Sequence, residues 1–224
     1  MSLRSMVACA ALSVACTRSQ PAPQPAPMSP PPAQPAPMSP PPELSPDAAL
    51  PPVVDAGPDA TVGILALEVS AAPRTTLLAA GDEAPAFRAT THDGAEVRVG
   101  GRRERALVVY FYPRDETPGC TREACAFRDA FSAYREAGAD IVGVSTDGPD
   151  AHRGFAAHHN LPFGLIADRD GALAAAFGVP VAQGGYAART TFVIGTDGRV
   201  KRVFPGVRVD GHSDEVLAAV RASR

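Results

Sequence analysis

Residues 106–125 read ALVVYFYPRDETPGCTREAC, and this stretch decides how the chain folds. Its first seven residues, Ala106–Tyr112, are all apolar or aromatic, which predicts a buried strand of a parallel or mixed sheet. Thr117 and Pro118 then supply a helix start signal, because threonine is a favoured N-cap and proline a favoured first helical residue. Apolar residues at helical spacing extend that helix to Tyr134. A core strand therefore leads directly into a helix.

Cys120 lies in the first turn of this predicted helix. Unpaired backbone N–H groups and the positive end of the helix dipole meet there, so the nucleophilic thiolate form is favoured. Thr117 comes three residues earlier, which places its hydroxyl on the same side of the helix as the sulfur. The alternative is that Cys120 is a small buried apolar residue and Thr117 only a helix cap. For an isolated cysteine that alternative is the commoner one.

A second cysteine, Cys125, follows Cys120 by five residues in the same predicted helix. Five residues rise ~7.5 Å and turn ~500°, so the two Cα atoms would stand roughly 8–9 Å apart on different faces. A disulfide needs Cα atoms within about 7 Å, so this bond requires the first turns of the helix to unwind. A reactive thiol whose partner is reached only by local unfolding suits a catalytic cycle better than a structural disulfide. A C-x-x-C motif is absent from the sequence, and one C-x4-C pair supplies only two metal ligands.

The pattern Pro113-x-x-x-Thr117-x-x-Cys120 resembles the active-site signature of peroxiredoxins. Residues 117–125, TPGCTREAC, resemble the bacterioferritin comigratory protein (BCP or PrxQ) branch of that family. The resemblance runs from about Gly81 to the C-terminus and recurs at four further places: Gly81–Phe87, Ile141–Asp147, Arg189–Ile194 and Val207–His212. It implies a thioredoxin-like fold.

The resemblance also implies a mechanism, that of an atypical 2-Cys thiol peroxidase. Cys120 would attack hydrogen peroxide or an organic hydroperoxide and become a sulfenic acid. Cys125 would convert it to an intramolecular disulfide, which thioredoxin or a periplasmic thioredoxin-like protein would reduce. Arg189 would stabilise the thiolate and the departing oxygen, Thr117 would hydrogen-bond the sulfur or the peroxide, and Pro113 would close the pocket against water. No bound cofactor or metal is implied, and a monomer is expected.

Two other functions stay open from the sequence. A membrane-tethered thiol–disulfide oxidoreductase on the same fold would exchange disulfides with protein substrates and turn over little peroxide, but the missing C-x-x-C motif disfavours it. A non-enzymatic peroxide sensor or binding module would instead use the disulfide to alter a partner interface. Steady-state turnover of hydrogen peroxide with a recycling dithiol separates the three functions.

The elements expected beyond the active-site helix alternate between strand and helix. An N-terminal hairpin turns at His92–Gly94 and ends at Val97–Val99. The segments that follow are strands 140–145 and 163–167, helices 149–159, 171–177 and 210–222, and strands 190–194 and 200–204 paired across 196–198. This order predicts a thioredoxin-like α/β fold with a central mixed sheet flanked by helices. The pair His158-His159 is interpreted as a solvated helix end, because no second ligand cluster accompanies it.

Residues 1–16 are interpreted as a secretory signal that ends in a lipoprotein cleavage box. Arg4 precedes an apolar run too short to span a bilayer, and small residues lead up to Cys16, which would be lipidated. The alternative is an uncleaved, disordered start. The expected location is the periplasmic side of a bacterial cell envelope. The residue after Cys16 is Thr17 and not an aspartate, which favours the outer membrane over the inner membrane.

Differences in composition divide residues 17–224 into three segments. Residues 17–60 hold 16 of the 24 prolines, and Gln24–Pro32 recurs as 34–42, so a disordered polyproline-rich tether is expected. Residues 61–80 form a lead-in without an assigned role, and residues 81–224 form the expected peroxiredoxin domain. The net charge of −3 gives no reason to invoke nucleic acid as a partner, and contact with a membrane is expected only through the lipid anchor.

Overall fold

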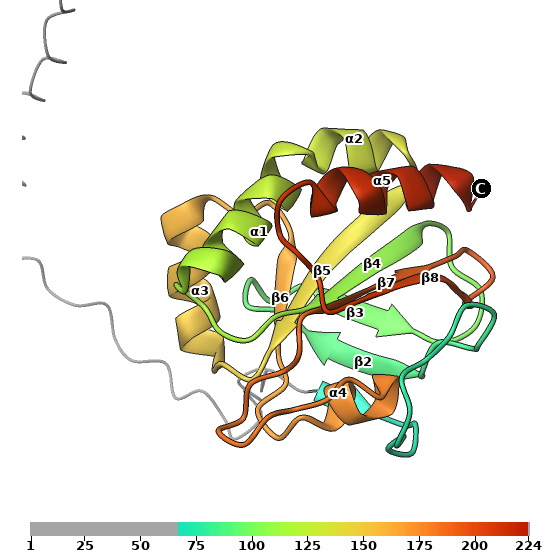
Figure 1. Cartoon of the computed structure of the whole chain (residues 1–224), viewed down its shortest axis with the longest axis horizontal. Coiled ribbons are helices and arrows are strands. Elements are labelled where there is room, and N and C mark those ends of the chain that lie inside the picture. The colour runs from blue at the N-terminus through green and yellow to red at the C-terminus, as the bar shows by residue number, and fades with distance from the viewer. Residues whose placement is uncertain (1–66, 224) are drawn as a thin grey trace, which may run out of the picture. The chain divides into compact units, whose positions relative to one another are not determined.

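The computed structural model describes residues 67–223 (Figure 1). The predicted signal segment, Cys16 and the proline-rich tether lie outside the described residues. Within 67–223, none of the helices combines the length and the apolar character needed to cross a bilayer.

A five-stranded mixed sheet forms the centre of the fold (Figure 1). The strand order is β6 (Gly164–Ala167), β5 (Ala139–Ser145), β4 (Ala106–Phe111), β7 (Thr190–Ile194) and β8 (Val200–Pro205). β4 pairs in parallel with β5 and antiparallel with β7, β6 pairs in parallel with β5, and β8 pairs antiparallel with β7. The predicted central mixed sheet is confirmed.

Helices cover one face of this sheet and a smaller sheet covers the other (Figure 1). The first group comprises α1 (Pro118–Asp129), α2 (Phe131–Glu136), α3 (Pro149–His159) and α5 (His212–Ala222). The second comprises α4 (Ala172–Phe177) and an antiparallel sheet of β1 (Leu67–Val69), β2 (Phe87–Thr90) and β3 (Glu96–Val99). This is the helix-flanked α/β arrangement that the alternation of segments predicts.

β4 is buried at every position, as its apolar sequence predicts. Val108 and Tyr110 belong to the hydrophobic core under the helices, whereas Val109 and Phe111 belong to the core under the small sheet. Successive side chains of a strand point to opposite faces, so an unbroken apolar run is what a strand between two cores requires. β4 therefore connects both cores and ends where the active-site loop begins.

The helix expected to run to Tyr134 is in fact two helices, so this prediction is wrong in its continuity. α1 ends at Asp129 and α2 begins at Phe131, with Ala130 between them at φ −92° and ψ 2°. The backbone N–H of Ala130 donates to Ala126 O at the end of α1, and the carbonyl of Ala130 accepts from the N–H of Tyr134 at the start of α2, so the two helices meet at this one residue. Beyond the kink Tyr134 is buried, and its hydroxyl donates to Ser213 O in α5 at 2.6 Å.

The other predicted elements lie within two residues of their observed bounds. The lead-in before residue 81 adds an edge strand, because β1 pairs antiparallel with β2 over three residues. Leu78 is buried and its backbone N–H donates to Phe177 O at 3.1 Å. The lead-in is thus attached to the domain at β1 and at Leu78, although its sequence carries no functional signal.

Candidate active site

Cys120 lies in the first turn of α1 and only 1% of it is exposed. The helix starts as the sequence predicts: Thr117 takes the N-cap position with extended backbone, and Pro118 is the first helical residue. Gly119 leaves the space that this geometry needs, since a Cβ there would lie 3.3 Å from Arg189 Nη2. The sulfur therefore sits at the positive end of a helix, beneath an arginine side chain.

Arg189 joins the sulfur to a buried carboxylate. Its Nη2 donates to Cys120 Sγ at 3.3 Å, and its Nη1 donates to Glu123 Oε2. The antiparallel pairing of Phe111 with Thr190 explains the contact, because it places Arg189 beside the end of β4, where the chain turns toward α1. The fork of the guanidinium thus holds two partners at once.

Glu123 is a site residue that the sequence analysis missed. It follows Cys120 by three residues on α1 and only 1% of it is exposed. Burial raises the pKa of Glu123 to about 7, against the opposing charge of Arg189. Its second oxygen, Oε1, is buried without a hydrogen-bond partner among the described residues. The i, i+3 spacing from Cys120 was the available signal, since it puts both side chains on one helix face.

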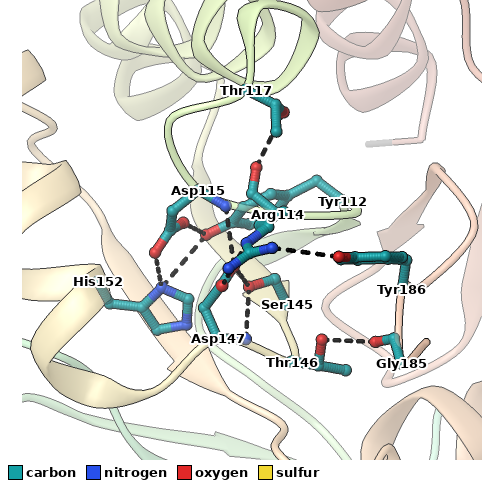
Figure 2. A network of polar contacts seen from close by, with 10 residues as sticks. All are labelled: Tyr112, Arg114, Asp115, Thr117, Ser145, Thr146, Asp147, His152, Gly185 and Tyr186. Carbon is teal, nitrogen blue, oxygen red and sulfur yellow. Dashed lines mark hydrogen bonds and ion pairs between the residues drawn. The ribbon is translucent and has the colours of Figure 1, made fainter.

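The loop between β4 and α1 rests on a buried polar network (Figure 2). The Tyr112 hydroxyl donates to Asp115 Oδ1 at 2.7 Å, and His152 Nδ1 lies 2.8 Å from Asp115 Oδ2. The other ring nitrogen of His152 lies 3.1 Å from Ile166 O. The backbone N–H of Asp115 donates to Asp147 Oδ2 at 2.8 Å. These contacts tie the loop to α3 and to the end of β5.

The exposed side of the same loop is held by a second set of contacts (Figure 2). Arg114 lies 3.7 Å from Asp147 as an ion pair and donates to the Tyr186 hydroxyl at 3.1 Å. Thr146 Oγ1 donates to Gly185 O at 2.6 Å, which connects the 184–186 loop to the end of β5. The active-site loop is thus braced from both sides before α1 begins.

Comparisons with known proteins agree with this geometry. The family model described as "AhpC/TSA family" matches residues 80–203, which is more than half of the chain. The chain belongs to the AhpC/TSA family. Its relatives place it among the peroxiredoxins of the BCP/PrxQ type.

For three of those relatives, the matched region covers most of the relative's own length. The "Putative peroxiredoxin bcp" of Coxiella burnetii is 39% identical over 143 residues, which cover 61% of this chain and 95% of that protein. The crystal structure of peroxidoxin BcpB from Mycobacterium tuberculosis has a TM-score of 0.58 and 37% identity, covering 65% of this chain and 97% of that one. A structure of the Xanthomonas campestris bacterioferritin comigratory protein has a TM-score of 0.56 and 35% identity, and the match covers 60% of this chain and 90% of that one.

Peroxiredoxins are thiol-dependent peroxidases, so the enzyme class predicted from the sequence is confirmed. Among the residues expected to act in this peroxiredoxin, the structure brings Cys120 and Arg189 into contact. Cys125 lies on the same helix, partly exposed, and both cysteines are free thiols. Pro113 is partly buried just beyond the end of β4.

Thr117 differs from expectation in its partner. Its hydroxyl donates to Arg114 O at 3.0 Å, and neither a contact with Cys120 Sγ nor a side-chain helix cap is formed in the described structure. The hydroxyl hydrogen is thus directed into the loop, and the lone pairs of the oxygen are left to accept a hydrogen bond.

Proposed function

We propose that this peroxiredoxin reduces hydrogen peroxide and organic hydroperoxides with Cys120 as the nucleophile. The observation that carries the proposal is the contact of 3.3 Å between Arg189 Nη2 and Cys120 Sγ, which directs a permanent positive charge at the sulfur. The start of α1 adds the positive end of its dipole. The related Xanthomonas campestris protein is described by its alkyl peroxide reduction activity, which supports organic hydroperoxides as substrates here.

In the first step the Cys120 thiolate attacks one oxygen of the peroxide and the O–O bond breaks. The sulfur is oxidised to a sulfenic acid, while the departing oxygen leaves as hydroxide or alkoxide and takes a proton to become water or an alcohol. Negative charge moves from the sulfur to that oxygen. Arg189 can stabilise the charge before and after this transfer, because its Nη2 already donates to the sulfur while its Nη1 is held by Glu123.

Thr117 would orient the peroxide in this scheme. Its hydroxyl hydrogen is committed to Arg114 O, so the oxygen can accept the O–H of a hydroperoxide. A substrate held between this acceptor and the Arg189 donors would present its oxygen to the sulfur. Pro113, which adds an apolar ring beside the site, would help to exclude water.

The second step would use Cys125 as the resolving residue. Its thiol attacks the sulfenic sulfur, water leaves, and a Cys120–Cys125 disulfide forms. Both residues lie on α1, five positions apart, so an intact helix keeps their Cα atoms too far apart for the bond. The first turns of α1 would therefore unwind. Thioredoxin or a thioredoxin-like dithiol would then reduce the disulfide and restore both thiols.

The test is steady-state turnover of hydrogen peroxide and of an alkyl hydroperoxide with a recycling thioredoxin system. We expect Cys120→Ser to abolish turnover, because serine is a far poorer nucleophile toward peroxide oxygen. Cys125→Ser should complete one turnover and accumulate sulfenic acid. A Cys120→Ser protein that kept its peroxidase activity would refute the assignment of the nucleophile.

A separate variant tests the role of Arg189 in catalysis. Arg189→Lys keeps a charge but loses the fork that joins Cys120 to Glu123, so we expect kcat/KM to fall by roughly 10²–10³-fold. Arg202→Lys, on the exposed side of β8, is the matched control and should leave kcat/KM unchanged. Equal losses in the two variants would show that the effect is a general one of charge or folding.

The same assay separates this function from its two rivals. A thiol–disulfide oxidoreductase would reduce or exchange protein disulfides and consume little peroxide, and a sensor would form its disulfide without multiple turnovers. We also propose that the protein works on the periplasmic side of a bacterial envelope, carried by a lipid anchor at Cys16. That proposal is supported by the sequence of residues 1–16.

A further inference from the structure

Outside the thiol site, two histidines converge on one carboxylate. His158 and His159 are the last two residues of α3, and Glu116 lies in the loop immediately before Thr117. His158 Nδ1 lies 3.1 Å from Glu116 Oε1, and His159 Nε2 lies 3.0 Å from Glu116 Oε2. The possible ligand atoms of all three side chains lie within 4.8 Å of one another. The sequence alone shows only the histidine pair.

The donor set is one that zinc prefers. Two imidazole nitrogens and one carboxylate oxygen, with water as the fourth ligand, form a common tetrahedral zinc site with bonds of about 2.0–2.2 Å. Ligand atoms in such a site stand about 3.3 Å apart. Each histidine nitrogen is now near a different oxygen of Glu116, at 3.1 and 3.0 Å, so a side-chain rotation is needed to bring both nitrogens around one oxygen. The His158 side chain is 69% exposed, so it can rotate to complete the geometry.

His159 is the more firmly held of the two imidazoles. The His159 side chain is only 16% exposed, and its ring packs edge-on against Phe155 at 5.0 Å. The Glu116 carboxylate lies between the two imidazole rings and is 48% exposed, so an ion can reach it from solvent. An ion would therefore meet one fixed imidazole, one carboxylate and one adjustable imidazole.

We propose that Glu116, His158 and His159 bind one divalent transition-metal ion of the zinc class. The ion would join the loop before α1 to the end of α3, two segments that lie side by side (Figure 1). The same end of α3 also holds the last turn of α1, because Arg128 Nη1 donates to His159 O at 2.8 Å. A bound ion would thus restrain the start of α1 while Arg128 restrains its end.

A bound ion would also affect formation of the Cys120–Cys125 disulfide, an effect that rests on the proposed function. If Cys120 and Cys125 form a disulfide, the first turns of α1 must unwind, and Glu116 stands directly before the residues that move. A metal crosslink to α3 opposes that movement. The ion should therefore stabilise the reduced, folded form and slow disulfide formation after peroxide addition.

Cobalt(II) is a suitable probe, because its visible spectrum reports coordination. We expect the reduced full-length chain to bind one Co²⁺ with the d–d bands of a tetrahedral nitrogen–oxygen site and without a sulfur-to-cobalt charge-transfer band. Glu116→Gln and His158→Ala should each weaken binding by roughly tenfold or more, since even outer residues of metal sites have effects of that size. Asp150→Asn removes the same charge as Glu116→Gln from an exposed position at the other end of α3 and should bind Co²⁺ normally.

Two results would overturn the site. One is equal Co²⁺ affinity in Glu116→Gln and the unaltered protein; the other is a dominant charge-transfer band, which would place the metal on cysteine. No peroxide is used in this experiment, so its outcome is independent of the peroxidase assay. Disulfide formation after one equivalent of peroxide, with and without Zn²⁺, then tests the coupling. A Zn²⁺ effect of equal size in Glu116→Gln would refute it.

Discussion

At the scale of single residues, the thiol site depends on a buried ion pair that lies behind the sulfur. Glu123 receives Arg189 Nη1, and Arg189 presents its other nitrogen to Cys120. A buried carboxylate is costly, and its unpartnered Oε1 adds to the cost. The buried carboxylate therefore lowers the stability of the fold but fixes the orientation of the Arg189 guanidinium. Reactive sites commonly reduce stability in this way.

This cost should appear as a pH dependence of stability. Burial raises the pKa of Glu123 from 4.5 to about 7, so the folded protein binds more protons than the unfolded chain between those values. Stability relative to Glu123→Gln should therefore fall as the pH rises from 4.5 to 7, by at most about 3 kcal/mol. Urea unfolding of both proteins at pH 5 and pH 7 measures the difference. A constant difference between them would show that Glu123 titrates as it does in the unfolded chain.

A second residue-scale prediction concerns the network under the loop. Tyr112→Phe removes the hydroxyl that donates to Asp115 Oδ1 at 2.7 Å and leaves that buried oxygen without its donor. We expect a loss of about 1–3 kcal/mol in the free energy of unfolding. Tyr186→Phe removes an exposed hydroxyl that binds Arg114, and it should stay within about 0.5 kcal/mol. Similar losses in the two variants would mean that the buried bond contributes no more than the exposed one.

At the scale of elements, α1 has two tasks that conflict. Its first turn directs the positive end of the helix dipole toward Cys120. The same turn separates Cys120 from Cys125, so the helix must open for the proposed disulfide to form. Contacts near both ends of the helix, Glu116 with His158 and His159 and Arg128 with His159 O, hold it to α3.

Hydrogen exchange tests this opening directly. The oxidised protein should exchange its backbone amides faster than the reduced protein across roughly residues 117–128, whereas β4 should stay protected because it is buried in the middle of the sheet. Peroxide-treated Cys125→Ser, which cannot form the disulfide, should retain the slow exchange of the reduced protein. Equal exchange in both redox states, with the disulfide confirmed by mass spectrometry, would show that α1 does not unwind.

At the scale of the whole molecule, the peroxiredoxin domain is joined to a long segment that the described structure does not include. Arg4, the apolar run and Cys16 predict lipidation, and residues 17–60 predict a tether. The full-length protein should fractionate with envelope membranes, and Cys16→Ala should block acylation and release it. Recovery of the mature protein from the cytosol with Met1 intact would contradict this prediction.

The sequence by itself determined what depends on neighbours along the chain. The apolar run of β4, the Thr117-Pro118 start signal and the cysteine spacing are local patterns, and they were enough to predict the central strand, the active-site helix and the family. The kink at Ala130 was missed, because α1 and α2 share one apolar periodicity and neither glycine nor proline marks the residues at their junction.

The tertiary structure alone decided which distant residues meet. Arg189 reaches Cys120 because β7 pairs with β4, and Glu116 reaches His158 and His159 because the fold brings the loop before α1 to the end of α3. Each half of such a contact is an ordinary charged or polar residue in its own stretch of sequence. Its chemistry arises only when strand order and helix packing bring the two halves within bonding distance, and no local periodicity encodes that.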